Sequence, residues 1–128
     1  MTGALGTHGG HQPRFQELCA PGARRASQEW RPLVLAPFQG PVACTRIKKG
    51  RGVCGTSWEK GITLIVNDVE KFPGHIACSS ASRSEIVVPV FQNGQIVGVL
   101  DVDSTELAHF DAIDQTYLEE IVGFLDQF

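Results

Sequence analysis

The clearest pattern of hydrophobic positions lies in the second half of the chain. Two runs, 85–91 and 96–103, carry apolar residues on both faces of an extended backbone and flank the dipeptide Asn93-Gly94. Asn-Gly between two apolar runs is a strong β-hairpin signature. Apolar side chains on both faces indicate strands that are covered on each side. Pro89 removes one ladder donor, so we expect a bulge or a sheet edge there.

Shorter apolar runs predict further strands at 33–36, 42–47 and 62–66. A short helix is expected over 54–60, ended by Gly61. A longer helix is expected to begin at Asp111, which can cap it. Its predicted apolar stripe consists of Ile113, Tyr117, Leu118, Ile121, Val122 and Leu125. Strands in the middle and a helix at the end predict an α+β fold with an antiparallel sheet.

Residues 1–32 differ from the rest, because Gly, Pro, His, Gln and Arg dominate and the apolar positions show no period. Such a composition favours a disordered or poorly packed tail. We therefore expect two parts, a divergent tail over 1–32 and one folded domain over 33–128. Cys19 falls in the tail and is expected to be an incidental thiol.

Composition agrees with a soluble globular domain. The chain has 128 residues, 42% of them hydrophobic and 20% charged, which suits one domain with one core. No apolar run reaches the length of a membrane span, and the N-terminus lacks the apolar centre of a secretory signal. We expect a cytoplasmic protein in a reducing compartment, where cysteines are usually catalytic, redox-sensing or metal-binding.

Charge is unevenly distributed. Arg46, Lys48, Lys49 and Arg51 form a basic segment, whereas all charged residues from Asp101 onward are acidic. The basic segment lacks the interleaved aromatics of a nucleic-acid surface, so we interpret it as a solvated loop. Neither a nucleic acid nor a membrane is an expected partner.

Three cysteines in the predicted domain are candidates for chemistry. A thiol that attacks a substrate must be accessible and deprotonated, and Cys78, in a Gly-bearing loop three residues after His75, is the best placed. A zinc site made of His75 with Cys44, Cys54 and Cys78 is conceivable. No CxxC occurs, however, and the spacing fits no common zinc pattern, so we predict no metal. For Cys54, a buried inert thiol is an equally good interpretation.

Three carboxylates form a second candidate group. Asp101 and Asp103 are two residues apart on a predicted strand, so both leave the same face. There they can bind an ammonium group or hold a proton, or they can simply be solvated at the strand end. A two-residue turn would place Glu85 opposite Val102, on the other face, whereas a bulge near Pro89 would cancel that. Both placements of Glu85 stay open.

Five blocks of the chain, in order, resemble the free methionine-(R)-sulfoxide reductases, which are GAF-domain enzymes. The blocks are FQGPVAC at 38–44, GRGVCGT at 50–56, PGHIAC at 73–78, SEIVVP at 84–89 and GVLDVDS at 98–104. The resemblance covers about residues 33–125 and implies a GAF-like domain with a central antiparallel sheet flanked by helices. The family's N-terminal helices and a Trp-x-Gly-Phe-Tyr-like strand find no match before Leu33. We therefore expect the first strand and those helices to be missing.

The resemblance also implies a reaction. Free L-methionine (R)-sulfoxide would be reduced to methionine through a cysteine sulfenic acid and an intramolecular disulfide, with thioredoxin as electron donor and no bound cofactor. At the matching positions Cys78 would be the nucleophile, Cys44 the resolving cysteine and Cys54 an auxiliary thiol. The residues implied to bind substrate are Glu85, Asp101, Asp103, Ile76 and Ala77.

Two other functions stay open from the sequence. The domain could be a GAF-type sensor that binds a small molecule without turnover, or an inactive fragment of the reductase that folds poorly alone. Two assignments also stay open, namely which of Cys44 and Cys54 resolves the sulfenic acid and which carboxylate carries the proton. A homodimer is an open alternative to a monomer.

Overall fold

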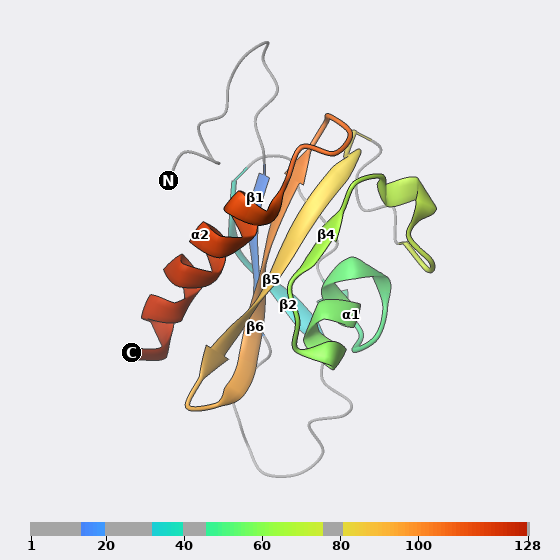
Figure 1. Ribbon diagram of the computed structural model, residues 1–128. Coiled ribbons are helices and arrows are strands. Elements are labelled where there is room, and N and C mark those ends of the chain that lie inside the picture. Colours follow the sequence, from blue (N-terminus) through green and yellow to red (C-terminus); the bar gives the residue numbers. More distant parts are fainter. Residues whose placement is uncertain (1–13, 20–31, 40–45, 76–80, 128) are drawn as a thin grey trace.

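The computed structural model describes residues 14–19, 32–39, 46–75 and 81–127 (Figure 1). Within these ranges six strands form one sheet in the order β3-β2-β1-β6-β5-β4, and every neighbouring pair is antiparallel. The strands are β1 (Arg14–Cys19), β2 (Leu33–Phe38), β3 (Arg46–Ile47), β4 (Leu64–Val66), β5 (Ser84–Gln92) and β6 (Gln95–Ser104). The helices are α1 (Gly52–Lys60) and α2 (Ala112–Gly123), with 3-10 turns η3 (Val69–Lys71) and η4 (Phe124–Gln127). The predicted α+β class is confirmed.

The β5–β6 hairpin is confirmed, and it contains a bulge. Asn93 and Gly94 both have positive φ angles, 52° and 74°, as a type I′ turn requires. Beyond the turn, Phe91 pairs with Ile96 but Val90 pairs with Gly98, so β6 holds one extra residue. Pro89 lies one residue from this irregularity and beyond the last pairing of β4 with β5. Both expectations for Pro89 are therefore confirmed: a bulge lies next to it, and this part of β5 has no pairing with β4.

Strand β1 corrects the prediction of a missing strand. It lies between β2 and β6, with Arg14 opposite Asp103 and Cys19 opposite Gly98. The expected tail over 1–32 is thus wrong for residues 14–19. A six-residue segment set among Gly and Pro gives little local signal, and its order comes from ladders with strands far away in sequence. Residues 1–13 and 20–31 of the expected tail, and with them the expected absence of N-terminal helices, lie outside the described ranges.

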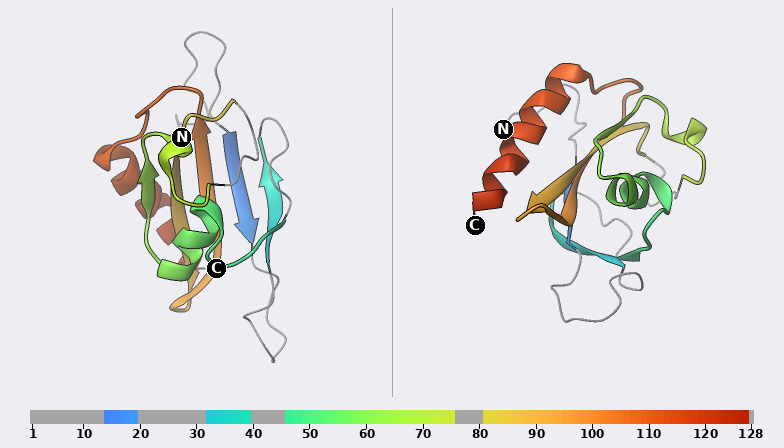
Figure 2. Two further views of the ribbon diagram at one scale, coloured as in Figure 1. Left: turned by 90° about the vertical axis from the view of Figure 1, so that its right-hand side faces the viewer. Right: turned by 60° about the horizontal axis from the view of Figure 1, so that its bottom comes forward.

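The two helices cover opposite faces of the sheet (Figure 2). Side chains alternate along a strand, so odd-numbered residues of β5 face α1 and even-numbered ones face α2. The core on the α1 side consists of Leu33, Ile47, Val53, Cys54, Trp58, Val66, Val69, Val87 and Val99. The core on the α2 side consists of Ile86, Val88, Val90, Val102, Phe110 and Val122. The β5–β6 hairpin is therefore buried on both sides, as its apolar residues on both faces predicted.

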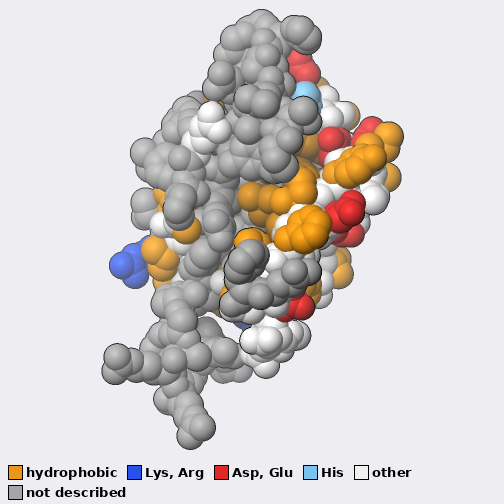
Figure 3. All heavy atoms as spheres, turned by 90° about the vertical axis from the view of Figure 1, so that its left-hand side faces the viewer, with side chains coloured by type: hydrophobic (Ala, Val, Ile, Leu, Met, Phe, Trp, Pro, Cys, Tyr) orange, Lys and Arg blue, Asp and Glu red, His pale blue; other side chains and the backbone are white. Residues whose placement is uncertain are grey.

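Helix α2 begins as predicted but buries less than expected. Asp111 accepts hydrogen bonds from the N–H groups of Ile113 and Asp114, and Asp114 accepts one from the Asp111 N–H in return. Of the predicted stripe only Val122 is buried, while Ile113 and Tyr117 are more than half exposed. Figure 3 shows apolar side chains on this side of the molecule. In the described ranges, no helix combines the length and apolar composition that crossing a membrane requires.

Candidate functional site

The position of Cys54 is set by a tight turn before α1. The Gly50 N–H donates to the Gly55 carbonyl at 2.9 Å, and the Arg51 N–H donates to the Lys48 carbonyl at 3.1 Å. A Cβ atom on Gly55 would lie 2.4 Å from the Lys48 carbonyl oxygen, so only glycine permits this approach. The turn therefore clamps the first helical turn, which carries Cys54 into the core at 5% exposure.

The bulge in β6 decides the face of Glu85. The ladder pairs Glu85 with Asp103 and Val87 with Asp101, so all three carboxylates lie on the α1 face. A regular ladder from the two-residue turn would have paired Glu85 with Val102 instead. The sequence left the face of Glu85 open. One extra residue in β6, opposite the step from Val90 to Phe91, places it on the α1 face. Asp103 also accepts a hydrogen bond from the Ser82 hydroxyl at 2.8 Å.

These residues form one buried group, which we call the acid cluster: Cys54, Glu85, Asp101 and Asp103. One donor atom each from Cys54, Glu85 and Asp101 lie within 4.8 Å of one another. The carboxylates are nearly inaccessible, with exposed fractions of 6% for Glu85, 5% for Asp101 and 7% for Asp103. Helix α1 and strands β5 and β6 thus bring a thiol and two acids to one point inside the protein, and the charge of Asp103 acts on that point.

The acid cluster raises the pKa of Asp101 well above its usual range. Burial is the largest cause that raises the pKa of Asp101, followed by the charges of Asp103 and Glu85 and a hydrogen bond with Glu85. A hydrogen bond with Cys54 acts in the opposite direction and is smaller. Among the described residues, the Oδ1 atom of Asp101 has no hydrogen-bond partner. The cluster therefore contains a buried carboxylic acid that can donate a proton to a bound molecule.

The same surroundings make Cys54 a poor nucleophile. Its position in the first turn of α1 would by itself favour a thiolate, because the helix N-terminus is positive. Burial outweighs this effect and raises the pKa of Cys54, with further increases from Asp101, Glu85 and Asp103. Cys54 therefore stays a thiol, which suits an auxiliary role better than attack.

The remaining predicted site residues lie outside the described ranges. They are Cys44, Cys78, Ile76 and Ala77. His75 is the last described residue before 76–80. It is half-buried, and its N–H donates to the Phe72 carbonyl. Of the predicted site, the structure thus brings together Cys54, Glu85, Asp101 and Asp103. Sequence reasoning missed Ser82, because nothing local distinguishes it from the neighbouring serines of 79–84.

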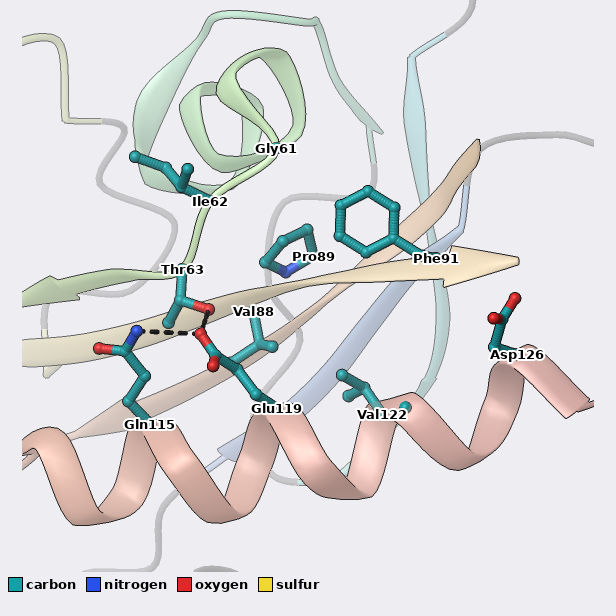
Figure 4. Close-up of a pocket in the computed structure, with 11 residues that line it drawn as sticks. Gly61, Ile62, Thr63, Val88, Pro89, Phe91, Gln115, Glu119, Val122 and Asp126 are labelled. Carbon is teal, nitrogen blue, oxygen red and sulfur yellow. Dashed lines mark hydrogen bonds between the residues drawn. The ribbon is translucent and has the colours of Figure 1, made fainter. Parts of the chain in front are cut away.

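A pocket lies apart from the acid cluster, between β5 and α2 (Figure 4). Its volume is about 480 Å³, and its wall includes Val88 and Val122 of the core on the α2 side. On one side Glu119 accepts hydrogen bonds from the Thr63 hydroxyl and from the Gln115 amide. The pocket shares no residue with the acid cluster, and no sequence pattern predicted it.

Comparison with known proteins places these features in a family context. The GAF domain family matches residues 10–127. GAF domain-containing protein A of Dictyostelium discoideum is 69% identical over 94 residues, which are 73% of this chain and 60% of that protein. Free methionine-R-sulfoxide reductase of Escherichia coli is 50% identical over 95 residues, which are 74% of this chain and 58% of that protein. The chain thus spans about 60% of the length of these curated relatives.

A solved structure gives the same result. Free methionine-R-sulfoxide reductase from Neisseria meningitidis, in complex with its substrate, superposes with a TM-score of 0.77 at 52% sequence identity. The superposition covers 90% of this chain and 65% of that one. Sequence and fold therefore agree on the same set of relatives.

Proposed function

Because this chain belongs to the GAF-domain family and is related to its free methionine-(R)-sulfoxide reductases, we propose that it reduces free L-methionine (R)-sulfoxide to L-methionine. The observation that carries the proposal is the buried Oδ1 atom of Asp101, which has no hydrogen-bond partner in the described part of the chain and belongs to a carboxyl whose pKa is raised by burial. A sulfoxide sulfur becomes a good electrophile only when its oxygen is protonated, so a neutral carboxylic acid is the group that this reaction needs.

The other carboxylates suit a free amino acid as substrate. Free methionine sulfoxide carries an ammonium group, whereas a methionine sulfoxide within a protein carries an amide there. Glu85 and Asp103 face each other across the β5–β6 ladder and can take a cation between them. We propose that they bind the substrate ammonium, with Ile76 and Ala77 completing the pocket.

The chemical steps balance with two thiols of the chain, Cys78 and Cys44, and with thioredoxin. The Cys78 thiolate attacks the sulfoxide sulfur while Asp101 protonates the oxygen, and methionine leaves as Cys78 becomes a sulfenic acid. The Cys44 thiol then condenses with the sulfenic acid, which forms the Cys44–Cys78 disulfide and releases water. A thioredoxin dithiol reduces this disulfide by exchange and is itself oxidised. Cys54, whose pKa is raised, remains a thiol throughout.

A coupled assay tests the proposal. The full chain is incubated with thioredoxin, its reductase and NADPH, and methionine formation is followed with free (R)-sulfoxide, free (S)-sulfoxide and an N-acetylated (R)-sulfoxide. We expect turnover of the free (R) form alone and its loss in Cys78→Ser, while Cys19→Ser serves as the matched control. Without reductant, mass spectrometry should find the loss of two hydrogen atoms, mapped to Cys44 and Cys78.

Two results would contradict the proposal. If the folded chain binds the sulfoxide equally well in wild type and Cys78→Ser but never forms methionine, the domain is a sensor. If the wild type melts broadly and binds hydrophobic dye, it is an inactive fragment.

A further inference from the structure

The acid cluster places three different metal-binding side chains at one point. Cys54 comes from α1, Glu85 from β5 and Asp101 from β6, and one donor atom of each lies within 4.8 Å of the other two. Donor atoms on one tetrahedral zinc ion lie roughly 3.3–3.8 Å apart, given Zn–S and Zn–O distances of about 2.3 and 2.0–2.2 Å. Small side-chain rotations would therefore close the three donors on one ion.

Asp101 supplies a second, independent observation. Its side chain is 5% exposed, and its Oδ1 atom has no hydrogen-bond partner among the described residues. Buried carboxylate oxygens are normally satisfied, so this atom is available to a bound ion. The ion pairs found among the described residues join Lys71 to Asp68 and His109 to Glu106, and neither reaches Asp101 or Cys54.

We infer that Cys54, Glu85 and Asp101 form a binding site for a divalent transition metal, with Zn²⁺ as the ion that fits the donor set. Mg²⁺ and Ca²⁺ prefer oxygen donors alone, and in larger number, whereas zinc takes sulfur and oxygen together. Three protein ligands leave a fourth position open. Zinc would displace the Cys54 proton to solvent on binding.

The evidence for this site does not rest on the proposed reductase activity, although the site shares residues with the proposed substrate pocket. Zinc and methionine sulfoxide would compete for Glu85 and Asp101, so an occupied metal site would block the reaction. The donor set also differs from the cysteine and histidine set considered from the sequence, since it uses one thiol and two carboxylates.

The test is a titration of the metal-free, full-length chain with Co²⁺ in a non-thiol reductant. Thiolate ligation gives a charge-transfer band in the near ultraviolet, and a tetrahedral site gives intense visible bands. We expect both in the wild type, with displacement by Zn²⁺. Cys54→Ser should abolish the charge-transfer band, and Asp101→Asn should weaken binding at least about tenfold.

Matched controls separate this site from other metal-binding groups. Glu106→Gln removes an exposed carboxylate, and Cys44→Ser/Cys78→Ser removes two other thiols; both variants should keep the band. Near-ultraviolet circular dichroism checks each fold, and the isosteric Asp101→Asn is the fallback if Cys54→Ser unfolds.

Three results would overturn the inference: no thiolate band in the wild type, an unchanged band in Cys54→Ser, or a band lost in Cys44→Ser/Cys78→Ser. Turnover is measured separately on metal-free protein. The proposed activity and the proposed metal site can therefore be disproved separately.

Discussion

The two faces of the sheet use the same strands for opposite purposes. On the α1 face, β5 and β6 contribute Glu85, Asp101 and Asp103 to a buried group of like charges. On the α2 face, neighbouring residues of the same strands form an apolar core, for example Ile86 and Val102. Alternation along a strand thus separates candidate chemistry from stability by a single residue.

The difference indicates how the fold tolerates the acid cluster. Burying ionisable groups of one sign costs free energy, because each loses water and repels the others. The α2 face carries no such cost, and its closely packed Val, Ile and Phe side chains offset that of the other face. We therefore expect substitutions to change stability in opposite directions on the two faces.

The largest effect should come from moving charge to the wrong face. Val102→Asp would bury an unpaired carboxylate under α2, and we expect a loss of roughly 3–5 kcal/mol in the free energy of unfolding. Urea denaturation followed by circular dichroism measures it. Leu107→Asp, at a half-exposed position, is the control and should change stability by less than about 0.5 kcal/mol. A small loss in Val102→Asp would show that the α2 face is not the stabilising one.

Removing charge from the α1 face should have the opposite sign. At a pH above its raised pKa, Asp101 is ionised and repels Glu85 and Asp103. Asp101→Asn removes that repulsion, so we expect a gain of about 1 kcal/mol in unfolding free energy there. The same change removes the proposed proton donor, and turnover should fall roughly 100-fold or more. Urea titration and the coupled assay measure the two effects. If Asp101→Asn were less stable than wild type, attractive interactions of Asp101 would outweigh the repulsion within the acid cluster.

The pH dependence of stability tests the same contrast. The pKa of Asp101 is raised in the folded state, above its unfolded value of about 3.9. Between these two values the folded state binds more protons than the unfolded state, so the stability from this group is present at low pH and is lost as the pH rises. Wild type should therefore lose stability relative to Asp101→Asn across that window. Parallel curves of unfolding free energy against pH would contradict this.

A smaller effect is expected at the start of α2. Asp111→Ala removes the capping oxygen that accepts from the Ile113 and Asp114 N–H groups, so we expect a loss of about 1 kcal/mol. Thermal melts measure it, with the exposed Tyr117→Ser as a control that should stay within about 0.5 kcal/mol. If both variants lost the same unfolding free energy, the exposed Tyr117 side chain would contribute as much to stability as the Asp111 cap.

The elements that the sequence predicted well are those with local chemical signals. Asn93-Gly94 dictates its turn through two positive φ angles, and Asp111 starts α2 through its own side chain. Gly61 ends α1 in a left-handed conformation, as expected. Each of these features depends on residues within four positions of one another, so a local pattern is sufficient to find it.

The features that the sequence did not determine depend on distant partners. Residues 14–19 become a strand because β2 and β6 present unpaired edges to them, which no local pattern reveals. Cys54 meets Asp101 only because α1 packs across the sheet. The face of Glu85 was left open because one extra residue in the ladder reverses it. Roles for Cys44 and Cys78 remain predictions from resemblance.

The bulge in the hairpin has a consequence for how the chain avoids misalignment. The turn alone would pair Gln92 with Gln95 and continue to Glu85 opposite Val102, whereas the observed ladder pairs Glu85 with Asp103. A strand that slipped into the simpler alignment would push Glu85 into hydrocarbon beneath α2 and turn Ile86 toward the acids. That error would cost several kcal/mol. We therefore expect the carboxylate that we propose to bind substrate also to disfavour the wrong register of the hairpin.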